Sequence, residues 1–258
     1  MTIICLGNKK GGVGKSLTTL NTAGAMVARA IRQGRNPENE VCIVDADTNE
    51  SIINYIRRRE AYSEKLVAEG MEALPFIKVE LRKPDDNLTR DLKALEKIYK
   101  YVLVDTGGYE NKAFKSTLTV ADVVYMPFQP SQVDIEQLIP TLFVAKQIEE
   151  NMQVSADEDF EIDARLLITK VDHHSKDLLV EAKQTCKKLL PFASISSVTI
   201  PTIKKINSIQ ESGLLLSDAQ VMHPKRAVFD QLLDEIDGKK AVAFKREAQL
   251  SDASDTNK

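Results

Sequence analysis

Short apolar runs recur along the chain, and between them the apolar residues follow a helical spacing. A short unbroken apolar run is typical of a strand that is buried on both faces, as in a parallel sheet with helices on each side. The alternation therefore predicts an α/β fold with a doubly wound, mostly parallel sheet flanked by helices. The stretches that carry this prediction are 3–6, 41–44, 101–104, 123–128 and 165–171.

Three helices can be placed from the same pattern. They span 15–32, 86–100 and 225–236, and the last follows Pro224, a residue favoured at helix starts. In the second helix, Leu88, Leu92, Leu95 and Ile98 recur at the spacing of a buried face.

The remaining stretches set the expected domain limits. We expect a turn-rich connection at 34–39 and an acidic loop at 152–161. One domain should cover 1–237, followed by a basic and then polar tail over 238–258, whose end at 251–258 is predicted to be disordered.

Candidate chemistry begins directly after the first apolar run, where residues 8–16 read Asn-Lys-Lys-Gly-Gly-Val-Gly-Lys-Ser. A strand that ends in a glycine-rich turn and opens a helix presents backbone N–H groups and the helix dipole to an anion. Gly11, Gly12 and Gly14 let the backbone approach phosphates closely. Lys15 would contact the β- and γ-phosphates, and the Ser16 hydroxyl would help to coordinate Mg²⁺. The segment predicts a nucleotide-binding site.

Acidic residues close two further predicted strands. Asp45 and Asp47 follow the run 41–44, and Asp105 follows 101–104. Ligands of open parallel sheets bind at the carboxyl ends of the strands, so we expect these carboxylates beside the phosphate-binding segment. For Asp45, and less so for Asp47, the alternative is an acidic loop that caps the following helix.

Lys10 makes the glycine-rich segment more specific. Where the usual phosphate-binding loop begins with glycine, this chain has Lys9, whereas Lys10 precedes the double glycine. The resulting Lys-Gly-Gly-Val-Gly-Lys-Ser resembles the deviant Walker A motif of the ParA/MinD family of ATPases. The resemblance implies a P-loop NTPase that binds ATP and Mg²⁺ and forms a homodimer in the ATP state. Lys10 would then reach the phosphates bound to the second chain and stabilise charge in phosphoryl transfer.

The same resemblance implies roles for the other residues. Lys10, Lys15 and Asp47 would be catalytic, with Asp47 orienting the attacking water. Ser16, Asp45 and Asp105 would serve the Mg²⁺ site, Asp105 through water. The nucleotide contacts implied are Lys10, Gly11, Gly12, Val13, Gly14, Lys15, Ser16 and Leu17, with Pro201 near the adenine.

Two further patterns are similar to those of small plasmid partition ATPases. Ser51, Tyr55 and Arg59 stand four residues apart, which places them on one helical face. Without the family, such a face is more often ordinary packing. Pro130-Ser131-x-x-Asp134 follows the strand 123–128 in a similar way.

Composition fits one globular domain in a reducing compartment. The chain has 258 residues, 43% of them hydrophobic, which is enough for a well-buried core. Cys5, Cys42 and Cys186 are an odd count and are expected to be small core residues. The chain starts directly with a predicted strand, and no segment approaches the length of a membrane span. His173 and His174 lack ligands nearby and are expected to have no metal role. We expect a cytoplasmic protein with no membrane contact.

The net charge of −3 excludes a chain that is basic throughout, yet basic clusters remain at 57–59, 187–188, 204–205 and 239–246. ATP-bound dimers of the ParA family bind DNA without sequence preference. Lys204 and Lys205, after Ile200-Pro201, match the basic position of that family best, although a solvated surface is the alternative. The resemblance thus implies a nucleoid-associated ATPase for plasmid or chromosome partition, whose hydrolysis a centromere-binding ParB-type protein stimulates.

Three other functions stay open at this point. A MinD-like membrane-associated ATPase would need a C-terminal amphipathic helix, and 241–246 is short for one. A ParA-like ATPase could instead position a protein cargo. A nucleotide-binding module without turnover is disfavoured by Asp47.

Overall fold

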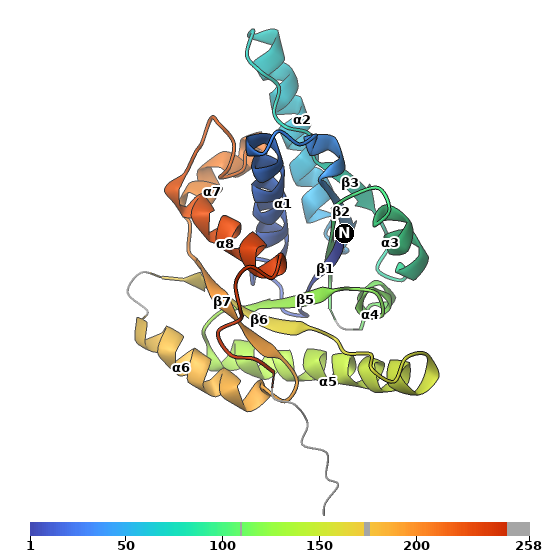
Figure 1. Cartoon of the computed structure of the whole chain (residues 1–258). Coiled ribbons are helices and arrows are strands. Elements are labelled where there is room, and N and C mark those ends of the chain that lie inside the picture. The colour runs from blue at the N-terminus through green and yellow to red at the C-terminus, as the bar shows by residue number, and fades with distance from the viewer. Residues whose placement is uncertain (109, 173–175, 247–258) are drawn as a thin grey trace, which may run out of the picture.

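Parallel strands form the centre of the molecule, and helices cover both faces of the sheet (Figure 1). The computed structural model describes residues 1–108, 110–172 and 176–246. The histidine pair 173–174 and the polar end 251–258 lie outside the described residues.

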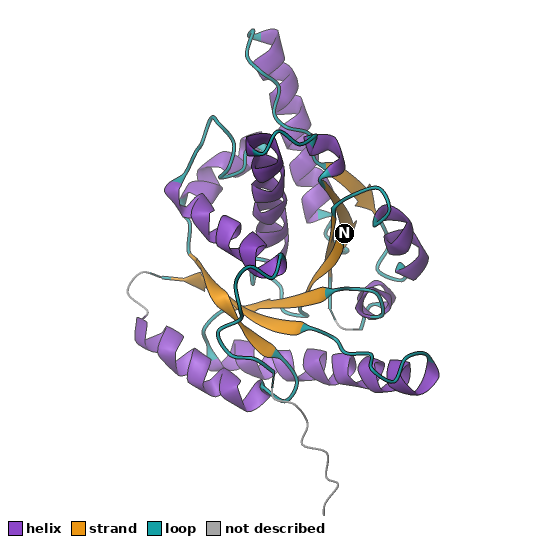
Figure 2. Cartoon of the chain, viewed as in Figure 1, coloured by secondary structure: helices purple, strands orange, loops and turns teal. Residues whose placement is uncertain are grey.

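The sheet has seven strands in the order β3-β2-β4-β1-β5-β6-β7, and every neighbouring pair is parallel (Figure 2). This confirms the predicted doubly wound fold. The strands are β1 Thr2–Gly7, β2 Val41–Ala46, β3 Lys78–Leu81, β4 Tyr101–Thr106, β5 Val123–Phe128, β6 Ala164–Val171 and β7 Ser194–Pro201.

Helices α1, α2, α7 and α8 cover one face, and α3 to α6 cover the other (Figure 1). Alternate residues of β1 reach opposite layers, since Ile4 and Leu6 pack with the first group and Cys5 with the second. The helices are α1 Lys15–Arg32, α2 Ser51–Ala68, α3 Thr89–Leu95, α4 Lys112–Leu118, α5 Gln132–Ser155, α6 Lys176–Cys186, α7 Lys205–Ile209 and α8 Ala227–Ile236, with short 3-10 turns η1 Pro37–Asn39, η2 Lys187–Leu189, η3 Gln210–Ser212 and η4 Pro224–Arg226.

Two predicted boundaries were wrong. The helix expected over 86–100 is only Thr89–Leu95, and Ile98 is 57% exposed. The apolar spacing extends beyond the helix itself. The chain turns after Leu95, and the Tyr101 N–H donates to the Glu40 carbonyl as β4 begins. The loop expected over 152–161 starts later, since α5 runs to Ser155.

The basic clusters at 57–59 and 239–246 are only partly available to a ligand. Arg59 is buried and forms a two-pronged ion pair with Asp218, at 2.5 and 2.9 Å. Arg246 donates to both oxygens of the buried Glu149, at 2.8 and 2.9 Å. In each cluster, one arginine is therefore held in an internal ion pair and is not available to a ligand.

The face of α2 that carries Tyr55 and Arg59 packs inward, as the interpretation without the family predicted. The Tyr55 hydroxyl donates to the Leu214 carbonyl at 2.6 Å. All three cysteines are buried and unpaired with one another, which confirms their place in the core. Within the described chain, no helix combines the length and the apolar character needed to cross a bilayer.

Candidate nucleotide-binding site

The predicted phosphate-binding segment lies where the strand order reverses, between β1 in the centre of the sheet and the start of α1. In the parallel register, Asp105 of β4 lies opposite Leu6 of β1 and opposite Asp45 of β2. The carboxyl ends of three strands thus bring the glycine-rich loop and two acids together, as the sequence predicted.

The loop itself has the backbone that its glycines allow. Gly12 and Gly14 have φ values of +76° and +92°, in the left-handed region that residues with a Cβ rarely adopt. Gly14 precedes the first turn of α1, and its carbonyl accepts the Thr18 N–H at 2.8 Å. Within the described residues, no side chain caps the start of α1, and the first-turn N–H groups of a helix favour an anion at that end.

Two buried polar side chains hold the loop in place. Asn8 donates from Nδ2 to the Pro127 carbonyl of β5 at 2.8 Å. The Thr169 hydroxyl of β6 lies 2.7 Å from the Val13 carbonyl and donates to it. Asn8 opens the predicted segment 8–16 but had no role assigned to it, and Thr169 was not among the predicted site residues.

Asp105 is the most unusual group of the site. Its side chain is fully buried, yet neither carboxylate oxygen has a hydrogen-bond partner among the described residues. Burial raises its pKa to about 7, although the nearby Ser16 hydroxyl and the charge of Lys15 lower it. A buried carboxylate without a partner is costly and indicates a missing cation or donor.

Asp45 has a different environment, and the helix-capping alternative describes its contacts. One oxygen accepts the N–H groups of Ile52 and Ile53, at 3.1 and 3.0 Å, in the first turn of α2. Burial raises the pKa of Asp45, while these backbone donors lower it. Asp47 is half-buried and accepts the Asn49 N–H at 3.1 Å.

Lys10 lies against its own chain. Its ammonium group forms an ion pair with Asp134, a buried residue in the first turn of α5. The second oxygen of Asp134 accepts the Gln129 N–H at 2.9 Å. The pattern Pro130-Ser131-x-x-Asp134 thus provides a carboxylate for Lys10 within the same chain, a contact that the sequence did not predict.

The other predicted site residues are spread along the same edge. Lys15 is buried at the start of α1, and the side chain of Leu17 packs against the core. Pro201 ends β7, two strands beyond β5. Lys204 and Lys205 follow it and are exposed.

The loop after β4 approaches the phosphate-binding segment closely. A Cβ at Gly108 would meet the backbone and side chain of Lys9 at 3.3 to 3.4 Å, which is tighter than most such contacts. Lys9 in turn forms an ion pair with Glu110 at 3.2 Å. Gly108 and Glu110 therefore lie close to the start of the loop 8–16.

Comparison with known proteins assigns the family. The family model described as ATPase MipZ matches residues 2–180, which is more than half of the chain. The chain therefore belongs to the MipZ ATPase family, within the ParA/MinD superfamily.

A curated relative is the maintenance of carboxysome distribution protein A of Gloeobacter kilaueensis, 28% identical over 189 residues. The match covers 72% of this chain and 71% of that protein.

Two solved structures show the same fold. One is a putative plasmid partition protein from Borrelia burgdorferi B31 bound to AMPPNP, with a TM-score of 0.59, 18% identity, and coverage of 92% of this chain and 98% of the other. The second is pNOB8 ParA bound to nonspecific DNA, with a TM-score of 0.56, 16% identity, and coverage of 93% and 99%.

Proposed function

We propose that this protein hydrolyses ATP, dimerises in the ATP state and associates with DNA, so that it can partition or position a cargo. The observation that carries the proposal is Asp105, which is fully buried beside a glycine-rich loop at the reversal of the sheet and has no hydrogen-bond partner among the residues that the structure describes. Membership in an ATPase family supports the same chemistry.

The residues at this edge suit a nucleotide with Mg²⁺. Lys15 and the backbone N–H groups of the loop would bind the β- and γ-phosphates. Ser16 and Asp105 would hold the cation, with Asp105 acting through water, and Asp45 would stay near it. The bound Mg²⁺ would neutralise charge that develops on the phosphates. The orphaned oxygens of Asp105 fit such a group because a nearby cation would offset their burial.

Asp47 is the proposed positioning group for water. It is half-buried and lies beyond the end of β2, whereas Asp45 is occupied in capping α2. A carboxylate with an accessible oxygen can orient a water molecule and accept its proton. We therefore propose that Asp47 orients the attacking water and that Asp45 links the first turn of α2 to the nucleotide site.

Lys10 is proposed to act across a dimer. To reach the phosphates of a second chain it would have to leave Asp134, which makes this ion pair a resting contact of the single chain. The added cation would then stabilise transition-state charge in the neighbouring site.

Association with DNA is proposed for the surface near α7. Lys204 and Lys205 are exposed there, and the Lys225 ammonium group donates to the Thr202 carbonyl at 3.0 Å, which adds a third cation nearby. The similarity to a ParA bound to nonspecific DNA supports association with DNA as such. A dimer would double each weak contact and so couple DNA affinity to the nucleotide state.

Two kinds of cargo have support. The fold neighbour that is a putative plasmid partition protein favours DNA partition, for which the sequence resemblance implies a ParB-type partner. The curated relative named for carboxysome distribution favours the positioning of a protein assembly. A MinD-like membrane role has less support, because Phe244 of the C-terminal segment packs with the core beneath β7.

Binding to a nonspecific DNA duplex, measured by fluorescence anisotropy with ATP, with ADP and without nucleotide, tests the proposal. We expect salt-sensitive binding only with ATP, and its loss in Lys10→Ala. The Lys204→Ala/Lys205→Ala variant should bind more weakly, whereas the control Lys97→Ala/Lys115→Ala should not. ATP-dependent binding to anionic vesicles, with no DNA binding in any state, would overturn the proposal.

A further inference from the structure

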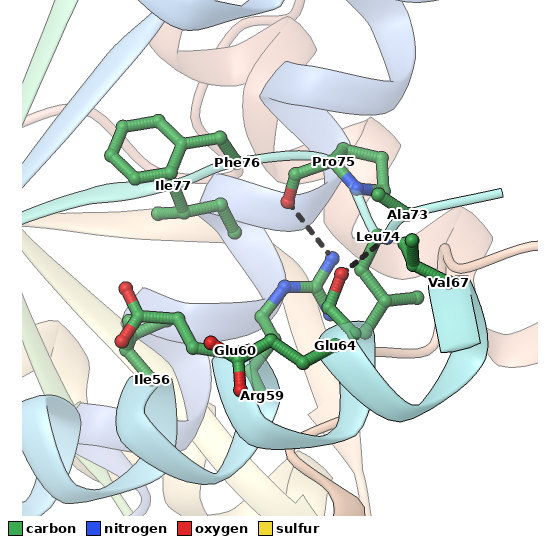
Figure 3. Close-up of a pocket in the computed structure, with 11 residues that line it drawn as sticks. Ile56, Arg59, Glu60, Glu64, Val67, Ala73, Leu74, Pro75, Phe76 and Ile77 are labelled. Carbon is green, nitrogen blue, oxygen red and sulfur yellow. Dashed lines mark hydrogen bonds between the residues drawn. The ribbon is translucent and has the colours of Figure 1, made fainter.

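A hollow whose lining includes none of the residues of the nucleotide edge lies between α2 and the extended segment 73–77 (Figure 3). It has a volume of about 560 Å³. Its floor is apolar and buried, made by Ile56, Leu74 and Ile77. We call this hollow the α2 groove.

The rim of the α2 groove exposes apolar surface. Val67, from the last turns of α2, is 54% exposed, and Phe76, from the extended segment, is 51% exposed. Exposed apolar side chains at the mouth of an apolar hollow indicate that something other than water contacts this surface.

The wall formed by α2 is acidic. Glu60 and Glu64 are one helical turn apart, line the groove and are exposed, and no hydrogen bond or ion pair is found for either within the described chain. Figure 3 shows both side chains among the residues that line the groove. A ligand with a positive charge near an apolar group fits this wall.

Arg59 adds a donor inside the groove. Its two terminal nitrogens are used by Asp218 and by the Pro75 and Gly213 carbonyls. Its Nε–H is buried and has no acceptor among the residues that the structure describes. An unpaired buried donor costs free energy, and a carbonyl oxygen entering the groove would satisfy it.

We propose that the α2 groove binds a short segment of a partner protein that carries an apolar side chain next to a lysine or arginine. The apolar side chain would fill the floor, a backbone carbonyl would accept the Arg59 Nε–H, and the cation would pair with Glu60 and Glu64. The acidic wall disfavours DNA and anionic lipid. This docking site goes beyond the proposed function, because it needs neither ATP nor a dimer.

Selection from a random dodecapeptide library on the nucleotide-free, full-length protein tests the proposal without assuming a sequence. We expect enriched peptides with an apolar residue within three positions of a lysine or arginine. By fluorescence anisotropy, these peptides should lose about tenfold or more in affinity for Glu60→Lys/Glu64→Lys. The Phe76→Ser variant, which alters only an exposed rim residue, should weaken them as well.

The matched control is Glu150→Lys/Glu158→Lys, the same change of charge near the end of α5, away from α2 (Figure 1). It should bind the peptides like the unaltered protein, and the Arg59 Nε–H resonance should shift when peptide is added. No enrichment, equal loss in the control, or an unmoved Arg59 resonance would overturn the proposal. So would binding to anionic vesicles that Phe76→Ser abolishes. ATP turnover, measured separately on the same variants, keeps this result distinct from the proposed function.

Discussion

Two fully enclosed carboxylates, Asp105 at the nucleotide edge and Glu149 on α5, have opposite surroundings. Glu149 accepts hydrogen bonds from Arg246, from Lys146 and from the Ile162 N–H. Although burial alone raises the pKa of Glu149, these donors lower it to about 2. Neither oxygen of Asp105 has a hydrogen-bond partner among the described residues, and burial raises its pKa to about 7 although Ser16 and Lys15 act to lower it.

The difference separates structural acids from a functional one. Glu235 is also fully buried, and it accepts bonds from the Tyr125 and Ser196 hydroxyls and from Ser197. Asp218 pairs with Arg59 in the same way. The fold thus satisfies its internal acids wherever they serve packing, and it leaves Asp105 incomplete where a ligand with a cation would bind.

The largest effect is expected from Asp105→Asn, which tests whether Asp105 is a functional acid and not a structural one. If Asp105 helps to hold Mg²⁺ beside ATP, turnover should fall by about 100-fold or more, because the cation that neutralises the phosphate charge would be bound less tightly. At pH 8 the nucleotide-free variant should nevertheless unfold at a higher temperature, since a buried charge without a partner has been removed. Steady-state phosphate release and thermal unfolding measure the two effects. A variant that is less stable and fully active would contradict the assignment.

Removing the partner of Glu149 should have the reverse effect. Arg246→Ala leaves a buried carboxylate without its main donor, and we expect a loss of about 3 kcal/mol in the free energy of unfolding. Activity per folded molecule should stay unchanged, because Glu149 is far from the loop 8–16 in the fold. Urea denaturation gives the stability, and the exposed Lys188→Ala is the control. A loss no larger than in the control would show that the C-terminal segment adds little to the domain.

The contributions of Asp105 and Glu149 to the free energy of unfolding should also change in opposite directions with pH. The pKa of Asp105 is raised in the folded state from 3.8 to about 7, so its contribution is present at low pH and is lost as pH rises across that range. The pKa of Glu149 is lowered from 4.5 to about 2, so its contribution is present above 4.5 and is lost as pH falls.

Urea denaturation at a series of pH values tests both directions. Asp105→Asn should flatten the decline of stability between pH 5 and about 7, and Arg246→Ala should flatten the acid decline below about 4.5. Identical pH curves for both variants and the unaltered protein would show that neither shift matters to folding.

Most of the fold could be predicted because the strands that build its centre are continuous apolar runs. The loop 8–16 and the acids at 45 and 105 could be placed together, since parallel strands deliver their carboxyl ends to one edge. The two edge strands were not among the predicted stretches, since β3 Lys78–Leu81 is short and polar and β7 Ser194–Pro201 mixes polar with apolar residues. Local pattern indicates an element well only where both faces are buried.

Pairings between distant residues could not be predicted. Arg246 belongs to a run of basic residues in which nothing distinguishes it from its neighbours, and the spacing of Arg59 from Tyr55 indicated a shared helical face but no partner. Their partners Asp218 and Glu149 are about 100 or more positions away, so only the folded chain identifies the pairs. The same limit hid the contact between Lys10 and Asp134.

The smallest effect is expected from a substitution that removes the ion pair between Lys10 and Asp134. Asp134→Asn would keep an acceptor for the Gln129 N–H but remove the charge that holds Lys10, whose side chain is 30% exposed. If the ion pair is a resting contact of the single chain, the ATP-dependent dimer should form at a protein concentration about threefold to tenfold lower, a change of about 1 kcal/mol. Sedimentation velocity with ATP and with ADP measures the shift. In the double variant with Lys10→Ala the substitution should have no further effect, because the side chain that it releases is gone. Weaker dimerisation in Asp134→Asn alone would instead mean that Asp134 supports the dimer, and that Lys10 acts from where it lies.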